Sequence, residues 1–123
     1  MKNTEIINTI SEPFALALGG GAARWLAHIW VIRRLEELQI TPMEIAWTSM
    51  GAIIAALYAL GFNSDAMEKI AKDTRLFRLV DFDLSHGIFE GTKIVEYFLE
   101  YFWDTCIEDL SILLTIVATD IDT

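Results

Sequence analysis

The segment Ile45–Ala52 constrains the fold of this chain most strongly. It reads Ile-Ala-Trp-Thr-Ser-Met-Gly-Ala, so a short apolar run passes directly into a run of small residues with a helical pattern. A strand that becomes a helix at Ser49 places the serine hydroxyl on a sharp turn at the carboxyl edge of a sheet, where the dipole of the following helix favours negative charge. Such a turn usually has glycine two positions before the serine, whereas this chain has Trp47.

A second strand-like run lies nearer the N-terminus. Phe14–Leu18 is apolar without polar alternation, which predicts a strand buried on both faces of a parallel sheet. It is followed by Gly19-Gly20-Gly21-Ala22-Ala23-Arg24 and then by a helical pattern. A glycine-rich turn between a strand and a helix can direct bare backbone N–H groups at an anion.

The rest of the chain continues the alternation of strands and helices. This alternation predicts an α/β fold with a mostly parallel sheet and helices on both faces. With only about three strands, it looks like the front part of a larger domain, residues 14–123, after a lead-in over residues 1–13.

The first expected helix is Ala23–Leu38, with Leu26, Ile29, Trp30, Leu35 and Leu38 on its apolar face. Gly51–Leu60 is expected to be a helix that is apolar nearly all round and therefore buried, with Gly61 as its C-cap. Two more helices are expected over Asn63–Asp73, with an N-cap among its first residues, and over Lys93–Phe102, capped by Thr92 and with Ile94, Val95, Phe98 and Tyr101 facing inward. The further expected strands are Met43–Ala46 and a buried Leu113–Ala118, and Arg75–Gly91 is expected to be a loop.

Composition excludes several classes of protein. The formal charge of −9 argues against a nucleic-acid surface and against attraction to anionic membranes by net charge. The single Cys106 has no partner for a disulfide or a zinc site, and residues 1–13 lack the pattern of a signal peptide. No apolar run approaches the ~20 residues that span a bilayer. We therefore expect a soluble cytoplasmic protein, with peripheral membrane contact and oligomeric state left open.

Each motif taken alone has a simpler interpretation. Ser49 alone is most often a helix N-cap. Gly19–Gly21 alone fits a structural turn or a nucleotide-phosphate loop, but Arg24 occupies the third glycine position of a dinucleotide motif and no phosphate-loop lysine follows. His28 could act as a general base, although its apolar neighbours favour a role in the core or behind the site. Other candidates have no partner pattern that singles them out: His86, Asp81, Asp83, Asp120 and Asp122.

Taken in order, the motifs resemble the amino-terminal half of a patatin-like phospholipase domain of the compact bacterial kind. Leu18–Arg24 resembles the G-G-G-x-x-R-G loop of that family, and Leu26-Ala27-His28-Ile29 resembles its following helix. Thr48–Ala52 resembles the G-x-S-x-G nucleophile motif, and Val117-Ala118-Thr119-Asp120 resembles a later strand. The resemblance covers the chain from about Phe14 to its last residue and implies a three-layer α/β/α fold.

The resemblance implies a serine–aspartate hydrolase of lipid acyl esters that uses no metal or cofactor. Ser49 would be the nucleophile in an elbow formed by Trp47, Thr48, Met50 and Gly51. The family's aspartate lies in a D-G-G or D-G-A motif, which this sequence lacks, so neither Asp120 nor Asp122 corresponds to it. An inactive fragment or binding module of the same fold is the alternative, and a nucleotide-binding α/β domain is a weaker one. The oxyanion hole would be formed by Gly19, Gly20, Gly21, Ala22 and Arg24.

All four tryptophans stand where the family pattern would have glycine. They are Trp25, Trp30, Trp47 and Trp103. Overpacking by a bulky side chain costs ~1–3 kcal/mol per site, so four such residues would be poorly tolerated together. UGA is read as glycine in some genetic codes and as tryptophan in others. We therefore interpret these residues as glycine codons translated as tryptophan, with four independent substitutions as the alternative.

Overall fold

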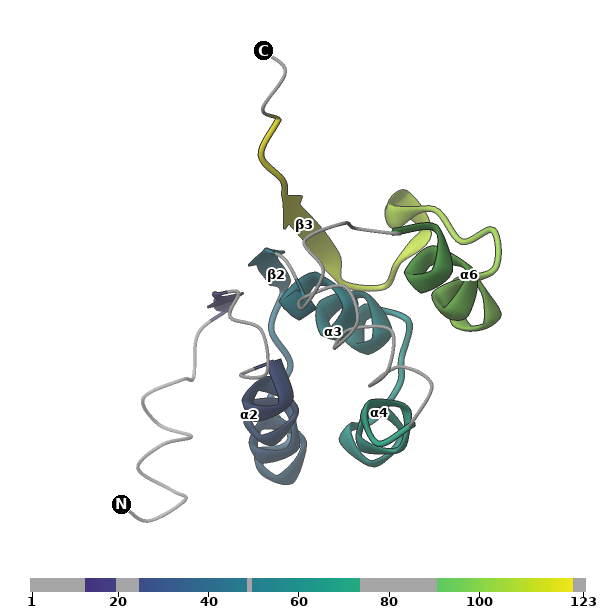
Figure 1. Cartoon of the computed structure of the whole chain (residues 1–123). Coiled ribbons are helices and arrows are strands. Elements are labelled where there is room, and N and C mark those ends of the chain that lie inside the picture. The colour runs from purple at the N-terminus through teal and green to yellow at the C-terminus, as the bar shows by residue number, and fades with distance from the viewer. Residues whose placement is uncertain (1–12, 20–24, 49, 74–90, 121–123) are drawn as a thin grey trace.

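A parallel sheet of three strands organises the molecule. The computed structural model describes residues 13–19, 25–48, 50–73 and 91–120. Strands β1 (Ala15–Leu18), β2 (Glu44–Thr48) and β3 (Leu113–Val117) lie in the order β1-β2-β3 (Figure 1). Leu18 is paired with Trp47, and Trp47 with Ile116, so the carboxyl ends of all three strands share one edge of the sheet.

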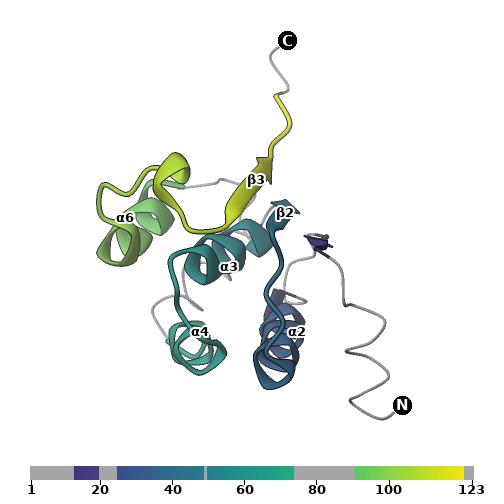
Figure 2. The ribbon, with the colours of Figure 1, turned by 180° about the vertical axis from the view of Figure 1, so that it is seen from behind.

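The described helices gather on one side of this sheet. They are α2 (Trp25–Leu38), α3 (Met50–Ala59), α4 (Ser64–Ala71) and α6 (Gly91–Phe102), with a short 3₁₀ turn η2 (Ile107–Asp109) before β3. The front and back views agree that α2, α3 and α4 lie on the same side of the strands, with α6 beyond α3 (Figures 1 and 2). Connections between parallel strands are almost always right-handed, so strands laid down in spatial order carry their connecting helices on one face.

The two faces of the sheet differ accordingly. The face toward the helices carries Ile45, Trp47 and Leu114, all of which are buried. The opposite face, called the open face below, exposes Leu113 by 63% and Val117 by 56%. The predicted burial of the first strand on both faces and the predicted burial of the third strand are therefore wrong within the described residues, because no described helix covers this side. The open face consists of Ala15, Ala17, Glu44, Ala46, Thr48, Leu113, Thr115 and Val117.

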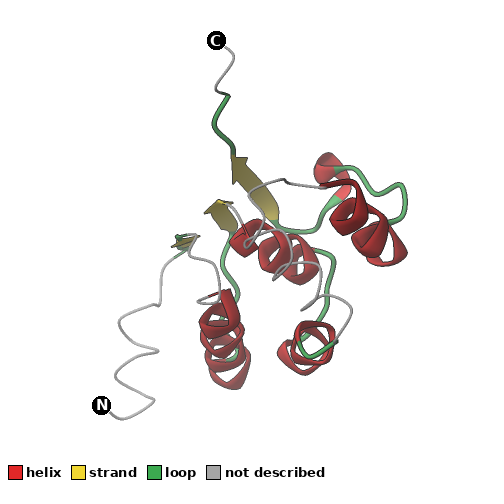
Figure 3. Cartoon of the chain, in the orientation of Figure 1, coloured by secondary structure: helices red, strands yellow, loops and turns green. Residues whose placement is uncertain are grey.

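The hydrophobic core lies between the sheet and the helices. Every described helix of eight residues or more contributes to it, and β2 at the centre of the sheet contributes two fully buried side chains. Figure 3 shows the packing of the helices against the strands. The predicted burial of the small-residue helix is confirmed, since α3 supplies several of the core residues. The core comprises Ile29, Ile32, Ile45, Trp47, Ile54, Ala55, Leu57, Met67, Ile70, Ala71, Tyr97, Phe98 and Leu114.

The junction between α3 and α4 follows the predicted capping pattern. Gly61 has a φ of +95°, its N–H donates to the carbonyl of Tyr58 at 2.9 Å, and the N–H of Phe62 donates to that of Leu57 at 3.0 Å. This is the paired bonding of a Schellman cap, which needs a residue that adopts positive φ without strain. The side chain of Asn63 accepts from the N–H of Ala66 at 2.9 Å and caps the next helix. Both predicted caps are confirmed.

Helix α6 differs from its prediction in its start and in its buried face. It begins at Gly91, so Thr92 lies inside the first turn and does not precede the helix. Val95 was expected to face inward but is 58% exposed, whereas Tyr97 is buried and donates from its hydroxyl to Asp73 Oδ2 at 3.0 Å. Burial, with Tyr101 and Asp73 close by, raises the pKa of Tyr97. The aromatic side chains of this helix therefore decide which face packs.

The predicted fold class is confirmed. The described residues form an α/β unit around a parallel sheet, and they account for two of the three predicted layers. Strand β2 runs to Thr48, two residues past its predicted end, because Trp47 and Thr48 are still paired with β3. Among the helices in the described ranges, none has the length and apolar character needed to cross a bilayer.

Candidate active site

The junction between β2 and α3 is very short. The strand ends at Thr48 and the helix begins at Met50, so a single residue separates them. That residue is Ser49, which lies outside the described residues. The hydroxyl of Thr48 donates to the carbonyl of Val117 at 3.1 Å and ties the end of β2 to the end of β3. The described chain therefore passes from β2 to α3 across one residue, at the carboxyl edge of the sheet.

The glycine-rich turn starts at the same edge. Because Leu18, the last residue of β1, is paired with Trp47, the turn that begins at Gly19 starts beside the end of β2. Gly19 is exposed, and a Cβ added to it would meet no atom of the described residues within 4 Å. The remaining predicted residues of this turn lie outside the described residues: Gly20, Gly21, Ala22 and Arg24. The described flanks of both motifs thus converge where ligand sites of parallel α/β sheets form.

His28 connects the two motifs. Its Nε2 lies 2.8 Å from the carbonyl oxygen of Gly19, and its ring centroid lies 5.2 Å from that of Trp47 at an interplanar angle of 48°. A carbonyl oxygen only accepts hydrogen bonds, so Nε2 carries a proton and donates it. Sequence reasoning placed His28 in the core or behind the site but had no means of finding its bond to Gly19.

Trp47 fills the space behind the β2–α3 junction. Its side chain is 2% exposed, and its Nε1 has no hydrogen-bond partner in the part of the chain that the structure describes. A buried indole N–H usually has a partner, and leaving one unpaired costs about 1–3 kcal/mol. A Cβ at Gly51 would lie 2.9 Å from Cδ1 of Trp47, so the first turn of α3 tolerates the indole only because Gly51 has no side chain.

Two other tryptophans occupy unusual places. Trp103 follows the last residue of α6 with a φ of +50°, and its N–H donates to the carbonyl of Leu99 at 3.0 Å. This is the helix-end position at which glycine is most favoured. Trp30 was expected to face the core, but it is 63% exposed, and the guanidinium of Arg33 lies 4.7 Å from its ring centroid. Trp25 is the first residue of α2, and its side chain is not among those that the structure describes.

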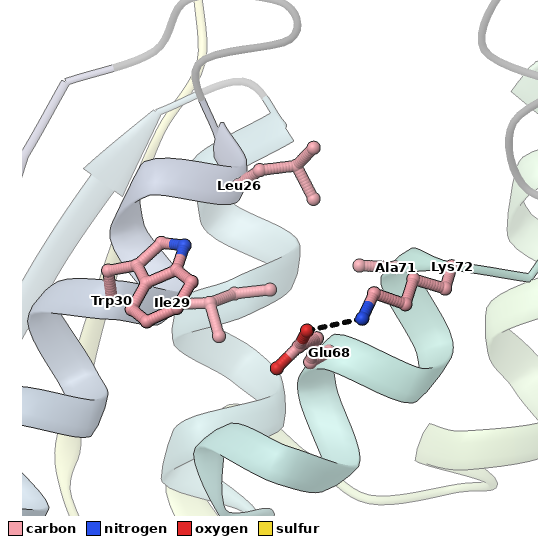
Figure 4. Close-up of a pocket in the computed structure, with 6 residues that line it drawn as sticks. All are labelled: Leu26, Ile29, Trp30, Glu68, Ala71 and Lys72. Carbon is pink, nitrogen blue, oxygen red and sulfur yellow. Dashed lines mark hydrogen bonds and ion pairs between the residues drawn. The ribbon is translucent and has the colours of Figure 1, made fainter.

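A hollow of about 350 Å³ lies between the first half of α2 and the end of α4. Figure 4 shows its apolar walls and the ion pair between Glu68 and Lys72 on its α4 side. The guanidinium of Arg33 also reaches across from α2 to Glu68 at 2.6 Å and to Asp65 at 3.0 Å. Sequence reasoning missed this cluster because its members lie about thirty residues apart. The hollow is lined by Leu26, Ile29, Trp30, Glu68, Ala71 and Lys72.

This cluster predicts a dependence of stability on pH. The pKa of Glu68 is lowered from 4.5 to about 2, first by the hydrogen bond from Arg33 and then by Lys72. Since the folded-state pKa is the lower one, the cluster stabilises the fold above pH 4.5 and loses this contribution as the pH falls toward 2.

We therefore expect Glu68→Gln to lower the Tm at pH 7, and the difference from the parent chain to close between pH 4.5 and 2. Thermal unfolding followed by circular dichroism measures it. Glu37→Gln is the matched control, because its pair with Arg34 lies on one helix surface with both side chains about half exposed. A Tm difference that is the same at pH 7 and pH 2.5 would contradict this assignment.

Of the other acidic and basic candidates that the sequence suggested, Asp120 alone lies among the described residues. Asp120 lies three residues beyond β3 and is exposed. His86, Asp81, Asp83 and Asp122 lie outside the described residues. Within the described ranges, His, Cys, Asp and Glu side chains do not gather in any group of three that would hold a metal ion. No described residue is therefore assigned as a metal ligand.

Known proteins are similar to this chain in sequence over most of its length. The family model of the patatin-like phospholipases matches residues 16–123. An uncharacterised NTE family protein of Mycobacterium bovis is 39% identical over 115 residues, which cover 90% of this chain and 32% of that protein. The human patatin-like phospholipase domain-containing protein 6 is 34% identical over 115 residues, covering 87% of this chain and 8% of that protein. A lysophospholipase of Neurospora crassa is 33% identical over 111 residues, covering 73% of this chain and 7% of that protein.

This chain spans about a third or less of the length of these relatives. The match nevertheless starts within β1 and continues past β3, so it includes both converging turns and every described helix. On the strength of that match and of its parallel α/β sheet, the chain belongs to the patatin-like phospholipase family.

Proposed function

We propose that this chain carries the nucleophile and the oxyanion-binding turn of a serine hydrolase that cleaves acyl esters of lipids. One observation supports this most: a single residue, Ser49, separates β2 from α3, beside the start of the glycine-rich turn. In this proposal the hydroxyl of Ser49 attacks the ester carbonyl. Backbone N–H groups of residues 20–22 hold the oxyanion of the tetrahedral intermediate, and the alcohol leaves as the acyl-enzyme forms. Water then hydrolyses the acyl-enzyme.

The reaction also needs a general base to take the proton of Ser49. The aspartate of the family resemblance belongs to a D-G-G or D-G-A motif, and the 123 residues contain no such motif. We propose that this base comes from polypeptide other than these residues, and that hydrolysis requires both parts. Asp120 is exposed beyond β3 and is not assigned this role.

The family indicates the substrate class. Patatin-like phospholipases act on lipids, and one relative is named a lysophospholipase. We propose a phospholipid, a lysophospholipid or another lipid ester as the substrate, reached by peripheral contact with a membrane or micelle. The cytoplasmic location expected from the sequence stays a prediction.

A second candidate is a binding module that keeps the fold without catalysis. The buried indole of Trp47 beside Gly51 and the absence of the aspartate motif favour it. A nucleotide-binding function has weaker support still. Arg24 stands at the position of the third glycine in the G-x-G-x-x-G motif, and no phosphate-loop lysine follows the turn.

Covalent labelling with a fluorophosphonate probe tests the proposal. The probe is applied to the chain alone and to the product of the gene extended past Thr123, and the labelled peptide is identified by mass spectrometry. We expect the label on Ser49, faster in the extended protein, and none after heat denaturation. Lipid binding without any labelling of the extended protein would support the binding module, and stabilisation by ATP or NAD would support the nucleotide site.

A further inference from the structure

A second hollow, called the β3 hollow below, lies on the side of the sheet that the helices cover. It has a volume of about 190 Å³ and is enclosed by α3, by β3 and by the end of α6 with the segment that follows it (Figure 1). Ala56 and Leu60 form its α3 wall, one helical turn apart, since the N–H of Leu60 donates to the carbonyl of Ala56 at 2.9 Å. Leu114 and Ile116 form its β3 wall, and all its lining residues belong to the described ranges.

The walls of the β3 hollow carry no charged side chain. Phe102, Ile107 and Leu110 complete the apolar lining, and its polar members are the hydroxyl of Thr105 and the thiol of Cys106. A cavity of ~150 Å³ with Leu, Ile and Phe walls stays dry and binds benzene, so the β3 hollow has room for about six carbon atoms of a hydrocarbon chain.

The hollow between α2 and α4 is less suited to a hydrocarbon. Glu68 and Lys72 stand in its wall, so an apolar ligand there would remove charged groups from water. The composition of the two linings therefore favours the β3 hollow as the site of a hydrocarbon chain.

The β3 hollow also extends toward the carboxyl edge of the sheet. Ile116 is paired with Trp47, and the next pair, Thr48 with Val117, ends β2. Ser49 follows at once, about 7 Å of strand beyond Trp47. Ile116 is 44% exposed and Ile107 is 48% exposed, so the hollow is open to the surface at both residues. A chain attached at the β2–α3 junction can therefore enter it along β3.

We propose that the β3 hollow binds the distal part of the substrate's acyl chain while its ester group lies at Ser49. This inference rests on the proposed hydrolase function and names the acyl-chain site that it uses. A butyryl group has three C–C bonds of about 1.5 Å each and ends short of the hollow, whereas a decanoyl group has nine and reaches into it. Each methylene that leaves water for an apolar site strengthens binding about fourfold, so the hollow selects the longer chain.

Substitutions that fill the hollow provide the first test. Ala56→Leu adds apolar volume to the α3 wall, and Ile107→Trp narrows the opening from an exposed position. Val95→Trp is the matched control, because Val95 is a similarly exposed apolar residue of α6 that does not line the hollow. Each variant is made in the extended protein, and kcat/KM is measured for monomeric p-nitrophenyl butyrate and p-nitrophenyl decanoate, together with Tm.

We expect Ala56→Leu and Ile107→Trp to lower kcat/KM for the decanoate on the order of 10-fold, the effect of excluding about two methylenes from the hollow. Hydrolysis of the butyrate and Tm stay nearly unchanged, and Val95→Trp affects neither ester. Equal losses on both esters, or an unchanged rate on the decanoate in both hollow variants, would overturn the proposal.

Photolabelling separates the acyl-chain site from the hydrolase function. The extended protein is irradiated with dodecanoic acid that carries a terminal diazirine, and the labelled residues are identified by mass spectrometry. We expect the label within residues 102–116, lost in Ala56→Leu and kept in Val95→Trp, even if the protein hydrolyses neither ester and the hydrolase function fails. A label on the α2–α4 hollow instead would contradict the site. So would labelling of residues 102–116 in the chain alone but not in the extended protein, because polypeptide beyond Thr123 would then fill the hollow.

Discussion

Ser49→Ala is expected to reduce kcat/KM for short-chain p-nitrophenyl esters by about 10³-fold or more in the extended protein. Ser49 is the one residue between β2 and α3, and no neighbouring side chain in this junction can replace its hydroxyl as the nucleophile: Thr48 donates its own hydroxyl to Val117, and Gly51 has no side chain. The residual rate reflects substrate binding and the oxyanion-binding turn alone. Initial rates, measured with enzyme concentrations normalised by folded fraction, check this expectation.

A helix-capping role for Ser49 predicts a different outcome, and Ser49→Asn separates the two. Asparagine caps helices about as well as serine but cannot form an acyl-enzyme. If Ser49 is the nucleophile, both variants are inactive. If Ser49 also caps α3, Ser49→Ala loses ~1 kcal/mol of stability and Ser49→Asn does not. An active Ser49→Asn protein would rule out Ser49 as the nucleophile.

Trp47→Gly is expected to increase the labelling rate of Ser49 on the order of 10- to 100-fold. The indole packs against Gly51 in the first turn of α3, and its Nε1 is buried without a partner among the described residues. Removing it lets the strand and helix approach as a nucleophile elbow requires, since a displacement of 1 Å can change a rate by ~10²-fold. Labelling kinetics of the two proteins, compared at equal folded fraction, provide the measurement.

The free energy of unfolding of Trp47→Gly tests independently whether the indole is misplaced. Removing a well-packed core tryptophan costs ~3–5 kcal/mol, so a native Trp47 would make Trp47→Gly strongly destabilising. A misplaced indole predicts a smaller loss or a gain. Trp47→Leu is the matched control, because it removes the unpaired N–H but still fills the space beside Gly51, and it should not accelerate labelling. UGG codons at positions 25, 30, 47 and 103 would exclude the translation of glycine codons as tryptophan.

Local features of the fold could be predicted from the sequence because they depend on neighbouring residues. The caps at Gly61 and Asn63 follow from the chemistry of one turn, and both are present. The apolar run of the small-residue helix predicts its burial directly. The meeting of the strand ends that precede the two motifs was also predictable, since parallel strands bring their carboxyl ends to one edge.

Features that depend on partners far along the chain could not be predicted. The contact of Arg33 with Glu68 requires knowing that α2 and α4 are neighbours, and no short pattern indicates this. Val95 and Tyr97 lie in the same amphipathic helix, and the choice between them depends on Asp73 and the aromatic cluster. The bond of His28 could not be predicted either, because it depends on how α2 is placed relative to the end of β1.

The open face of the sheet limits where a further layer can begin. A fourth parallel strand added beside β3 by another right-handed connection would bring its helix to the side that is already covered. Only a strand laid down outside β1 reverses the direction of winding and carries its helix over Ala15, Ala17 and Ala46. A helix layer over the open face would therefore start from a strand added at the outer edge of β1. Because β1 leads directly into the glycine-rich turn, that addition would also enclose the turn from its other side.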